Sequence, residues 1–302
     1  MSSTDIAKRT ELEVFRDINL DNPNDAAVIF AKSGLFSDIK GFTFMTETLG
    51  NDIIDVLNLH YQRAIAQIHD HHGIVGSIIG DALLAVYGTM KSEENMALEA
   101  LRSAYRIQEV AGELRGEITK KRETIVLRRG ALTEAEERVY RAVLVEVGVG
   151  LDGGEVFYGN IGSYERMTNT VIGDNVNSAS RLEGLTRIYK VPVVCSEFVK
   201  NEVEAVSSGE FRFIEIDVVQ VKGKTEGKRI YWPVRESFLD DELAKEFLSF
   251  SAGLQAYYEG NWQEAGAAWR GVNLPVVEVF RDRIAGGKVP ANWNGIWAMT
   301  TK

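Results

Sequence analysis

Two aspartates, Asp38 and Asp81, are the side chains of this sequence with the clearest chemical potential. Each lies where a predicted strand gives way to a loop, Asp38 ahead of Gly41 and Asp81 directly after Gly80. Two carboxylates at the edges of adjoining strands can hold two divalent cations, and two cations can bind a nucleoside triphosphate, activate a hydroxyl and stabilise a leaving phosphate. Aspartate is also common in turns, so the pair alone is weak evidence for such a site.

A second group of motifs makes this interpretation specific. A glycine-punctuated run over residues 148–162 precedes the sequence NTVIGDNVNSASRLE, in which Asn177 and Arg181 are four residues apart. Residues at that spacing share one face of a helix, and taken alone they are more typical of the polar face of a surface helix. Together with the Asp38 and Asp81 segments, in this order, the motifs closely resemble the catalytic domain of class III nucleotidyl cyclases, the adenylate and guanylate cyclase family, over roughly residues 25–235.

The resemblance implies a reaction and a metal site. The ribose 3′-hydroxyl would attack the α-phosphorus of a nucleoside triphosphate, and pyrophosphate would leave in line. Asp38 and Asp81, assisted by the carbonyl of Ile39, would hold two Mg²⁺ or Mn²⁺ ions, and a metal-activated hydroxyl makes a side-chain base unnecessary. Asn177 and Arg181 would fix the ribose and neutralise charge on the α-phosphate.

The resemblance also implies contacts with the triphosphate. Lys222, in the sequence VKGK, matches the family lysine that contacts the terminal phosphates, although an exposed loop lysine would look the same. The backbone amides from Ile39 to Thr43, at an expected helix start, would cradle the β- and γ-phosphates beside Phe42 and Thr43. Gly41 would allow the close approach of the phosphates to the backbone.

The implied site needs two subunits. In this family the metal-binding and transition-state residues of one site come from opposite chains, and this sequence has one copy of each set. We therefore expect a head-to-tail homodimer with two equivalent sites, and an inactive single chain.

The residues that would read the base depart from the family pattern. Adenylate cyclases usually carry a lysine four residues before the second metal aspartate and guanylate cyclases an acidic residue, whereas this chain has Ser77. Thr170 is ordinary for bacterial adenylate cyclases, while Asn169 stands where an aromatic residue is usual. A serine would leave purine edges poorly satisfied. In this departure the chain resembles the pyrimidine cyclases of bacterial anti-phage systems. We therefore expect UTP or CTP as the substrate, with ATP as the alternative. The product, cUMP or cCMP, would act on a separate effector.

Composition and charge limit the binding partners and the cellular location that we expect. The chain has 302 residues and a net charge of −10, which argues against binding to nucleic acid or to anionic lipid. Cys195 is the only cysteine, so disulfides within one chain are excluded. No apolar run reaches the length of a membrane span and the N-terminus lacks a signal-peptide core, so we expect a cytoplasmic protein without membrane insertion.

The elements that must position these residues mix strand–helix–strand units with hairpins. This order favours an α+β fold, and the resemblance implies a ferredoxin-like βαββαβ-type class III cyclase sandwich with a C-terminal helical hairpin. The expected domains are an N-terminal helix (1–22), the catalytic domain (23–236) and a helical extension (237–302). The segments that we predict are helices at 4–19, 46–71, 92–115, 174–189 and 196–204, strands at 26–31, 74–79, 83–87, 144–151, 191–195, 211–221 and 228–232, a charged loop or arm at 116–143, a hairpin at 153–162, and two helices within 240–270 joined at Gly260.

Two other functions fit the same sequence. One is an inactive cyclase-like module that only binds nucleotide or a partner. The other is a partner-binding or dimer-stabilising role for residues 240–270, which is compatible with an active enzyme.

Overall fold

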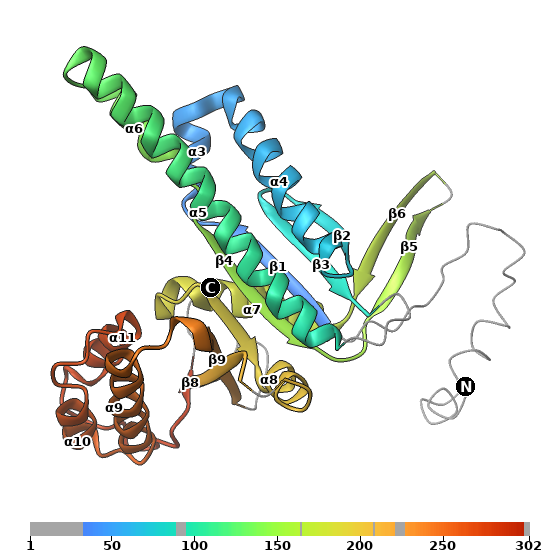
Figure 1. The fold of residues 1–302 in the computed structure, drawn as a ribbon. Coiled ribbons are helices and arrows are strands. Elements are labelled where there is room, and N and C mark those ends of the chain that lie inside the picture. Colours follow the sequence, from blue (N-terminus) through green and yellow to red (C-terminus); the bar gives the residue numbers. More distant parts are fainter. Residues whose placement is uncertain (1–32, 89–94, 164, 208, 221–226, 299–302) are drawn as a thin grey trace, which may run out of the picture.

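The computed structural model describes residues 33–88, 95–163, 165–207, 209–220 and 227–298. The helix and strand predicted before residue 33, and Lys222, lie outside these ranges. Within them the chain forms an eight-stranded sheet and a separate two-stranded ribbon (Figure 1). The strands are β1 (Ser33–Ile39), β2 (Gly73–Ile79), β3 (Ala82–Tyr87), β4 (Val147–Gly153), β5 (Phe157–Ser163), β6 (Arg166–Ile172), β7 (Val193–Ser196), β8 (Phe211–Gln220), β9 (Lys228–Arg235) and β10 (Trp297–Ala298).

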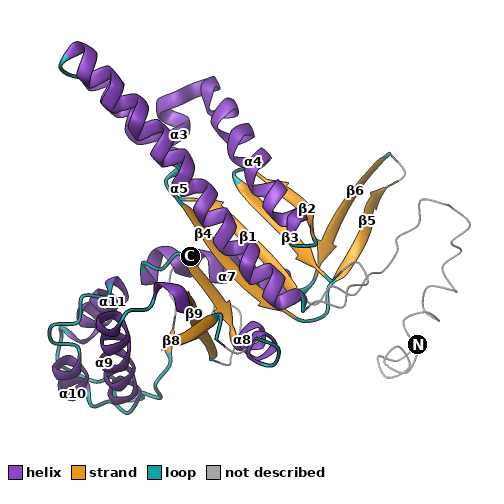
Figure 2. Cartoon of the chain, in the orientation of Figure 1, coloured by secondary structure: helices purple, strands orange, loops and turns teal. Residues whose placement is uncertain are grey.

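Helices cover both faces of this sheet (Figure 2). The helices of the described ranges are α3 (Phe42–Leu49), α4 (Ile53–Asp70), α5 (Met96–Arg129), α6 (Glu134–Ala142), α7 (Asp174–Tyr189), α8 (Glu197–Glu204), α9 (Asp241–Tyr258), α10 (Trp262–Ala268) and α11 (Pro275–Ile284), with 3-10 turns η1 (Gly50–Asp52) and η2 (Glu236–Phe238). None of the helices in the described ranges combines the length and the apolar character needed to cross a bilayer.

The sheet order is β10-β8-β9-β7-β4-β1-β3-β2, and β5 pairs only with β6. Strand β1 lies between β3 and β4 and is antiparallel to both, whereas β4 and β7 are parallel. Hairpins and crossovers therefore share one sheet, and the predicted α+β class is confirmed. The predicted hairpin at 153–162 is displaced along the chain, because its strands are β5 and β6.

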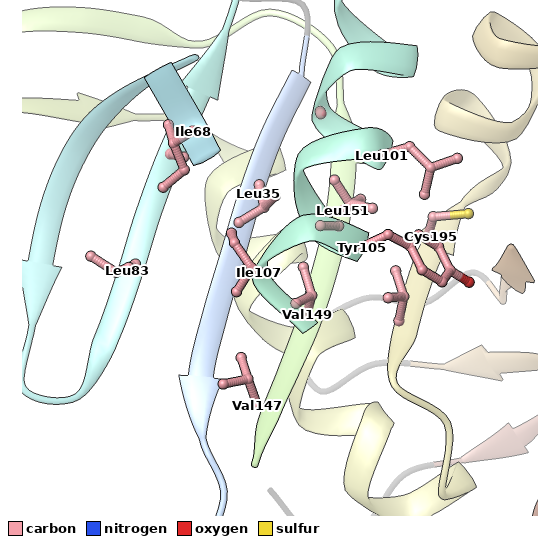
Figure 3. Packing of buried hydrophobic residues seen from close by; sticks show 14 of the residues in the cluster. Leu35, Ile68, Leu83, Leu101, Tyr105, Ile107, Val147, Val149, Leu151 and Cys195 are labelled. Carbon is pink, nitrogen blue, oxygen red and sulfur yellow. The ribbon is translucent and has the colours of Figure 1, made fainter. Parts of the chain in front are cut away.

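Three hydrophobic clusters cover the two faces of the sheet: one lies beneath α4 and α5, and the other two lie on the opposite face, beneath α7 and beside the β5–β6 ribbon. Strand β7 illustrates the alternation, since Val193 and Cys195 belong to the core beneath α4 and α5 while Val194 belongs to the core beneath α7. Figure 3 shows the first core, in which Leu35 and Val149 of neighbouring strands pack against α5. This packing fixes β1, and with it Asp38, between β3 and β4 in the interior of the sheet.

Helix α7 lies close to β4 because positions 148 and 150 of that strand are glycine. A β-carbon on Gly150 would lie 2.2 Å from the carbonyl oxygen of Ala179 and 2.2 Å from the backbone nitrogen of Glu183. A β-carbon on Gly148 would lie 2.5 Å from the Glu183 carboxylate. The glycine-punctuated motif therefore seats the helix that carries Asn177 and Arg181.

The single helix predicted for residues 46–71 is wrong, because the structure has two helices there. Helix α3 ends at Leu49, the chain passes through η1 at Gly50, and α4 begins at Ile53. Gly50 has a φ of 55°, a conformation that glycine adopts without strain. The apolar spacing runs through this break, so periodicity alone did not reveal it.

Residues 116–143 form an arm of two helices, so the alternative of a solvated loop is wrong. Helix α5 continues to Arg129 over 34 residues, and α6 begins with a capping box between Thr133 and Glu136. Arg122 pairs with Glu137, so α6 folds back along α5, and the arm projects from the sheet in Figure 1. The charges that suggested a loop instead join the two helices.

The C-terminal region packs onto the sheet and α7. Helices α9 and α10 confirm the two helices predicted within 240–270, whereas α11 and β10 were not predicted. Trp269 is fully buried, and a β-carbon on Gly253 would lie 2.3 Å from its indole nitrogen. Strand β10 pairs in parallel with Val219 and Gln220 of β8. The domain limits at residues 22 and 236 stay predictions.

Candidate functional site

The two aspartates lie together at the same end of the adjoining strands β1 and β3. Asp38 is the penultimate residue of β1, and Asp81 occupies the turn between β2 and the neighbouring strand β3. Burial, a hydrogen bond with Asp38 and the charge of that carboxylate together raise the pKa of Asp81 to about 6, although the backbone amides of Asp81 and Ile39 lower it. Two carboxylates this close favour a bound cation, since a cation allows both to ionise.

An arginine that the sequence analysis did not single out contacts this pair. Nη2 of Arg187, near the C-terminal end of α7, donates to Oδ2 of Asp38 at 2.5 Å and lies 3.4 Å from Oε1 of Glu183. Burial raises the pKa of Glu183 to about 7, against the lowering effect of Arg187. Arg187 therefore supplies the positive charge beside Asp38. One indication of an interaction at Arg187 is present in the sequence, because this residue follows Glu183 by four positions and so shares its helix face.

The aspartate pair fits Mg²⁺ or Mn²⁺. Two carboxylates and the Ile39 carbonyl are hard oxygen donors, the kind that these ions prefer. In the described part of the chain there is no group of three or more His, Cys, Asp and Glu side chains that could hold a metal. Asp38, Asp81 and Ile39 would therefore hold the ions together with oxygens of the substrate and of water.

Tyr61 fixes the turn that carries Asp81. Its hydroxyl, from α4, donates to the carbonyl of Gly80 at 2.7 Å. Burial, together with the charges of Asp81 and Asp38, raises the pKa of Tyr61 to about 12. The phenol therefore keeps its proton and remains a donor at neutral pH.

The predicted phosphate cradle lies at the start of α3. Gly41 precedes the helix with a φ of 75°, and no side chain caps the first turn. Phe42 packs partly buried against the first core, whereas Thr43 is exposed. The first amides of a helix have no partner within the helix, so they suit an anion beside Asp38.

Asn177 and Arg181 lie on the exposed side of α7. The opposite side of the helix, with Ala179 and Glu183, is buried against β4. Since Arg187 touches Asp38, the helical rise puts Arg181 about 9 Å and Asn177 about 15 Å further along the helix axis. One chain therefore presents the two halves of the predicted site at separate places.

Two of the three predicted base-reading residues meet. Oγ of Ser77, on β2 just after a register shift, lies 3.4 Å from Oγ1 of Thr170 on β6. The ribbon can approach β2 this closely because residue 76 is glycine, where a β-carbon would lie 2.7 Å from the Val171 side chain. Asn169 pairs with Asn160 across the ribbon.

Comparison with known proteins identifies the family of this fold and site. Residues 31–234 match the adenylate and guanylate cyclase catalytic domain. A terminal-differentiation-specific adenylate cyclase of Dictyostelium discoideum is 30% identical over 235 residues, which cover 76% of this chain and 10% of that protein. An adenylate cyclase of Anabaena cylindrica is 31% identical over 198 residues, which cover 65% of this chain and 35% of that protein. The chain thus spans a minor part of these two relatives.

A solved structure shares the fold. A bacterial light-regulated adenylyl cyclase superposes with a TM-score of 0.55 at 25% identity, over 76% of this chain and 59% of that one. The family match begins before Asp38 and ends after Arg181, so it includes both halves of the site. The chain therefore belongs to the adenylate and guanylate cyclase catalytic domain family.

Proposed function

We propose that the chain is a subunit of a nucleotidyl cyclase, which converts a nucleoside triphosphate to a 3′,5′-cyclic nucleotide and pyrophosphate. Asp38, Asp81 and the Ile39 carbonyl of one copy would hold two divalent ions, which activate the 3′-hydroxyl and neutralise the leaving phosphates when bound. Asn177 and Arg181 of a second, head-to-tail copy would bind the ribose and the α-phosphate. Lys222 and the amides from Ile39 to Thr43 would hold the terminal phosphates.

The separation of the two halves within one chain carries this proposal. The aspartates carry an excess of negative charge that Arg187 offsets in part, so they suit cations. Asn177 and Arg181 point away from the buried side of α7 and suit a ligand supplied from outside the chain. A two-fold partner that turns its α7 toward Asp38 would complete both sites at once.

We propose a pyrimidine substrate, UTP or CTP, for this site. Ser77 and Thr170 are two short hydroxyl side chains that lie 3.4 Å apart, and both can donate or accept a hydrogen bond. This pair suits a small base with adjacent donor and acceptor groups. ATP is the competing substrate, since the curated relatives named above are adenylate cyclases. A separate effector in antiviral defence, and a cytoplasmic location, stay predictions.

The substrate test offers each of the four ribonucleoside triphosphates with Mn²⁺ to the purified chain and identifies the products by mass spectrometry. We expect cUMP or cCMP as the main product. Predominant cAMP would refute the pyrimidine assignment but would still support a nucleotidyl cyclase. Absence of every cyclic nucleotide, from a protein whose dimer is confirmed, would favour the inactive nucleotide-binding module.

The shared site has its own test. Asp38→Asn and Arg181→Ala are each expected to be inactive as homodimers. Mixing them should restore one active site in each heterodimer, because that site takes Asp38 from one chain and Arg181 from the other. Heterodimers that form without regaining activity would contradict the shared site.

A further inference from the structure

Three side chains from β9, β4 and α7 form a polar cluster beside the predicted transition-state residues. The ammonium of Lys228, the first residue of β9, pairs with Oδ2 of Asp152 on β4. The same ammonium donates to Oγ of Ser178 on α7 at 2.8 Å. We call Lys228, Asp152 and Ser178 the β9–α7 link.

The buried carboxylate of Asp152 holds the partly exposed Lys228 in place. Asp152 is 1% exposed, and its Oδ1 accepts the backbone N–H of Gly153 at 2.9 Å. An ionised carboxylate removed from water needs a compensating charge, and removing one partner of such a pair is strongly destabilising. Lys228 is therefore held by Asp152, and a second of its three N–H donors remains for Ser178.

Ser178 connects the link to the proposed reaction site. It directly follows Asn177, and Arg181 is less than one helical turn further on. No side chain caps the start of α7, and the glycine-dependent contacts with β4 fix the helix at Ala179 and Glu183, on its buried side. The hydrogen bond from Lys228 acts on the turn that presents Asn177 and Arg181.

We propose that Lys228 is a positioning residue for Asn177 and Arg181, acting through Ser178. Asp152 fixes the ammonium, the ammonium fixes Ser178, and the first turns of α7 keep one orientation toward a nucleotide. This role rests on the proposed cyclase function. It predicts that the link serves only the site to which its own chain contributes Arg181, and not the site to which that chain contributes Asp38.

Directed heterodimers test this asymmetry. When an Asp38→Asn chain is mixed with an Arg181→Ala chain, the one working site uses Arg181 of the first chain and Asp38 of the second. Ser178→Ala placed on the Asp38→Asn chain should lower kcat about 10- to 100-fold with little change in KM, since a displacement near 1 Å at a reaction site has such effects. The same substitution on the Arg181→Ala chain should leave kcat unchanged.

Matched variants separate positioning from folding. Lys228→Arg keeps the charge and a donor, and should retain more activity than Lys228→Met. The double variant Asp152→Asn with Lys228→Met avoids an unpaired buried carboxylate and should still show the asymmetric loss. Lys200→Met removes a lysine that pairs with Glu204 within α8, so it controls for loss of an ion pair elsewhere.

Two results would overturn the proposal. One is an equal loss of kcat whichever chain carries Ser178→Ala, which would indicate a general effect on folding or assembly. The other is an unchanged kcat in both arrangements. If the mixture of Asp38→Asn and Arg181→Ala chains is itself inactive, that result refutes the shared site and not the role of Lys228. The role of Lys228 is then tested in Ser178→Ala homodimers, where an unchanged kcat refutes it.

Discussion

Replacement of Arg283 by methionine tests how the C-terminal helices are joined to the catalytic fold. Arg283, on α11, is bonded through Nη1 to Oδ2 of Asp217 on β8 at 2.6 Å, and through Nη2 to the hydroxyl of Tyr189 on α7 at 2.9 Å. The side chains of Arg283 and Asp217 are 6% and 0% exposed. The guanidinium also stacks on the ring of Trp297, with 4.5 Å between the guanidinium carbon and the ring centroid.

The expected loss in the free energy of unfolding follows from the burial of Asp217. Breaking a buried ion pair by removing one partner costs about 3–5 kcal/mol, because it leaves an uncompensated charge away from water. Burial already raises the pKa of Asp217, although Arg283 and the Tyr189 hydroxyl lower it. Without Arg283 this pKa rises further, so the folded state binds a proton that the unfolded state releases, and the variant loses stability as the pH rises.

The assay is urea unfolding of the whole chain at pH 5 and pH 8, with the wild type and with the double variant Asp217→Asn, Arg283→Met. We expect Arg283→Met to lose about 3–5 kcal/mol at pH 8 and less at pH 5, and the double variant to recover most of the loss. A loss below about 1 kcal/mol at pH 8 would refute the reasoning, because a contribution that small is typical of an exposed ion pair. A deficit that does not depend on pH would show that Asp217 is not its source.

Three further predictions concern other sites. Burial lowers the pKa of His60 to about 4, so the unfolded chain alone binds that proton between pH 4 and 6.5. The free energy of unfolding, measured in urea titrations, should be unaffected above pH 6.5 and about 2 kcal/mol lower at pH 5. His60→Leu should flatten this pH dependence, and an equal pH dependence in the variant and the wild type would contradict the prediction. Arg187→Gln should bind Mn²⁺ about two- to fivefold more tightly in calorimetry, because no guanidinium competes for Asp38, and weaker binding would refute this competition. Arg138→Ala removes contacts from α6 to Thr48 and to the Phe44 ring, both on α3. Because α3 would bind the terminal phosphates, we expect KM for the triphosphate to rise about two- to fivefold, and an unchanged KM would count against this role.

Several elements were predictable because their signals are local. Helix α7 spans 174–189 as predicted, and the β2–β3 hairpin turns at Gly80 and Asp81. Gly80 has a φ of 64°, which glycine adopts without strain. These elements depend on neighbours a few residues away, so a single sequence contains the information.

Other features depended on residues far apart in the chain. The charges of residues 116–143 suggested solvent exposure, yet Arg122 and Glu137 join two helices. Helix α11 and β10 were missed, and their place is set by the buried Asp217–Arg283 pair and by pairing with β8. Arg187 beside Asp38 was also missed, because its spacing from Glu183 does not reveal a contact with a residue 149 positions earlier.

The sequence by itself determined the family and the residue types of the candidate site, because Asp38, Asp81, Asn177 and Arg181 occur in recognisable local motifs. The tertiary structure decided how these residues lie relative to one another. It separates the aspartates from Asn177 and Arg181, brings Ser77 within 3.4 Å of Thr170, and links Lys228 to Ser178. The physical reason is that such distances depend on how the sheet, the ribbon and α7 pack. That packing depends on close approaches at Gly76, Gly148 and Gly150, which no local pattern specifies.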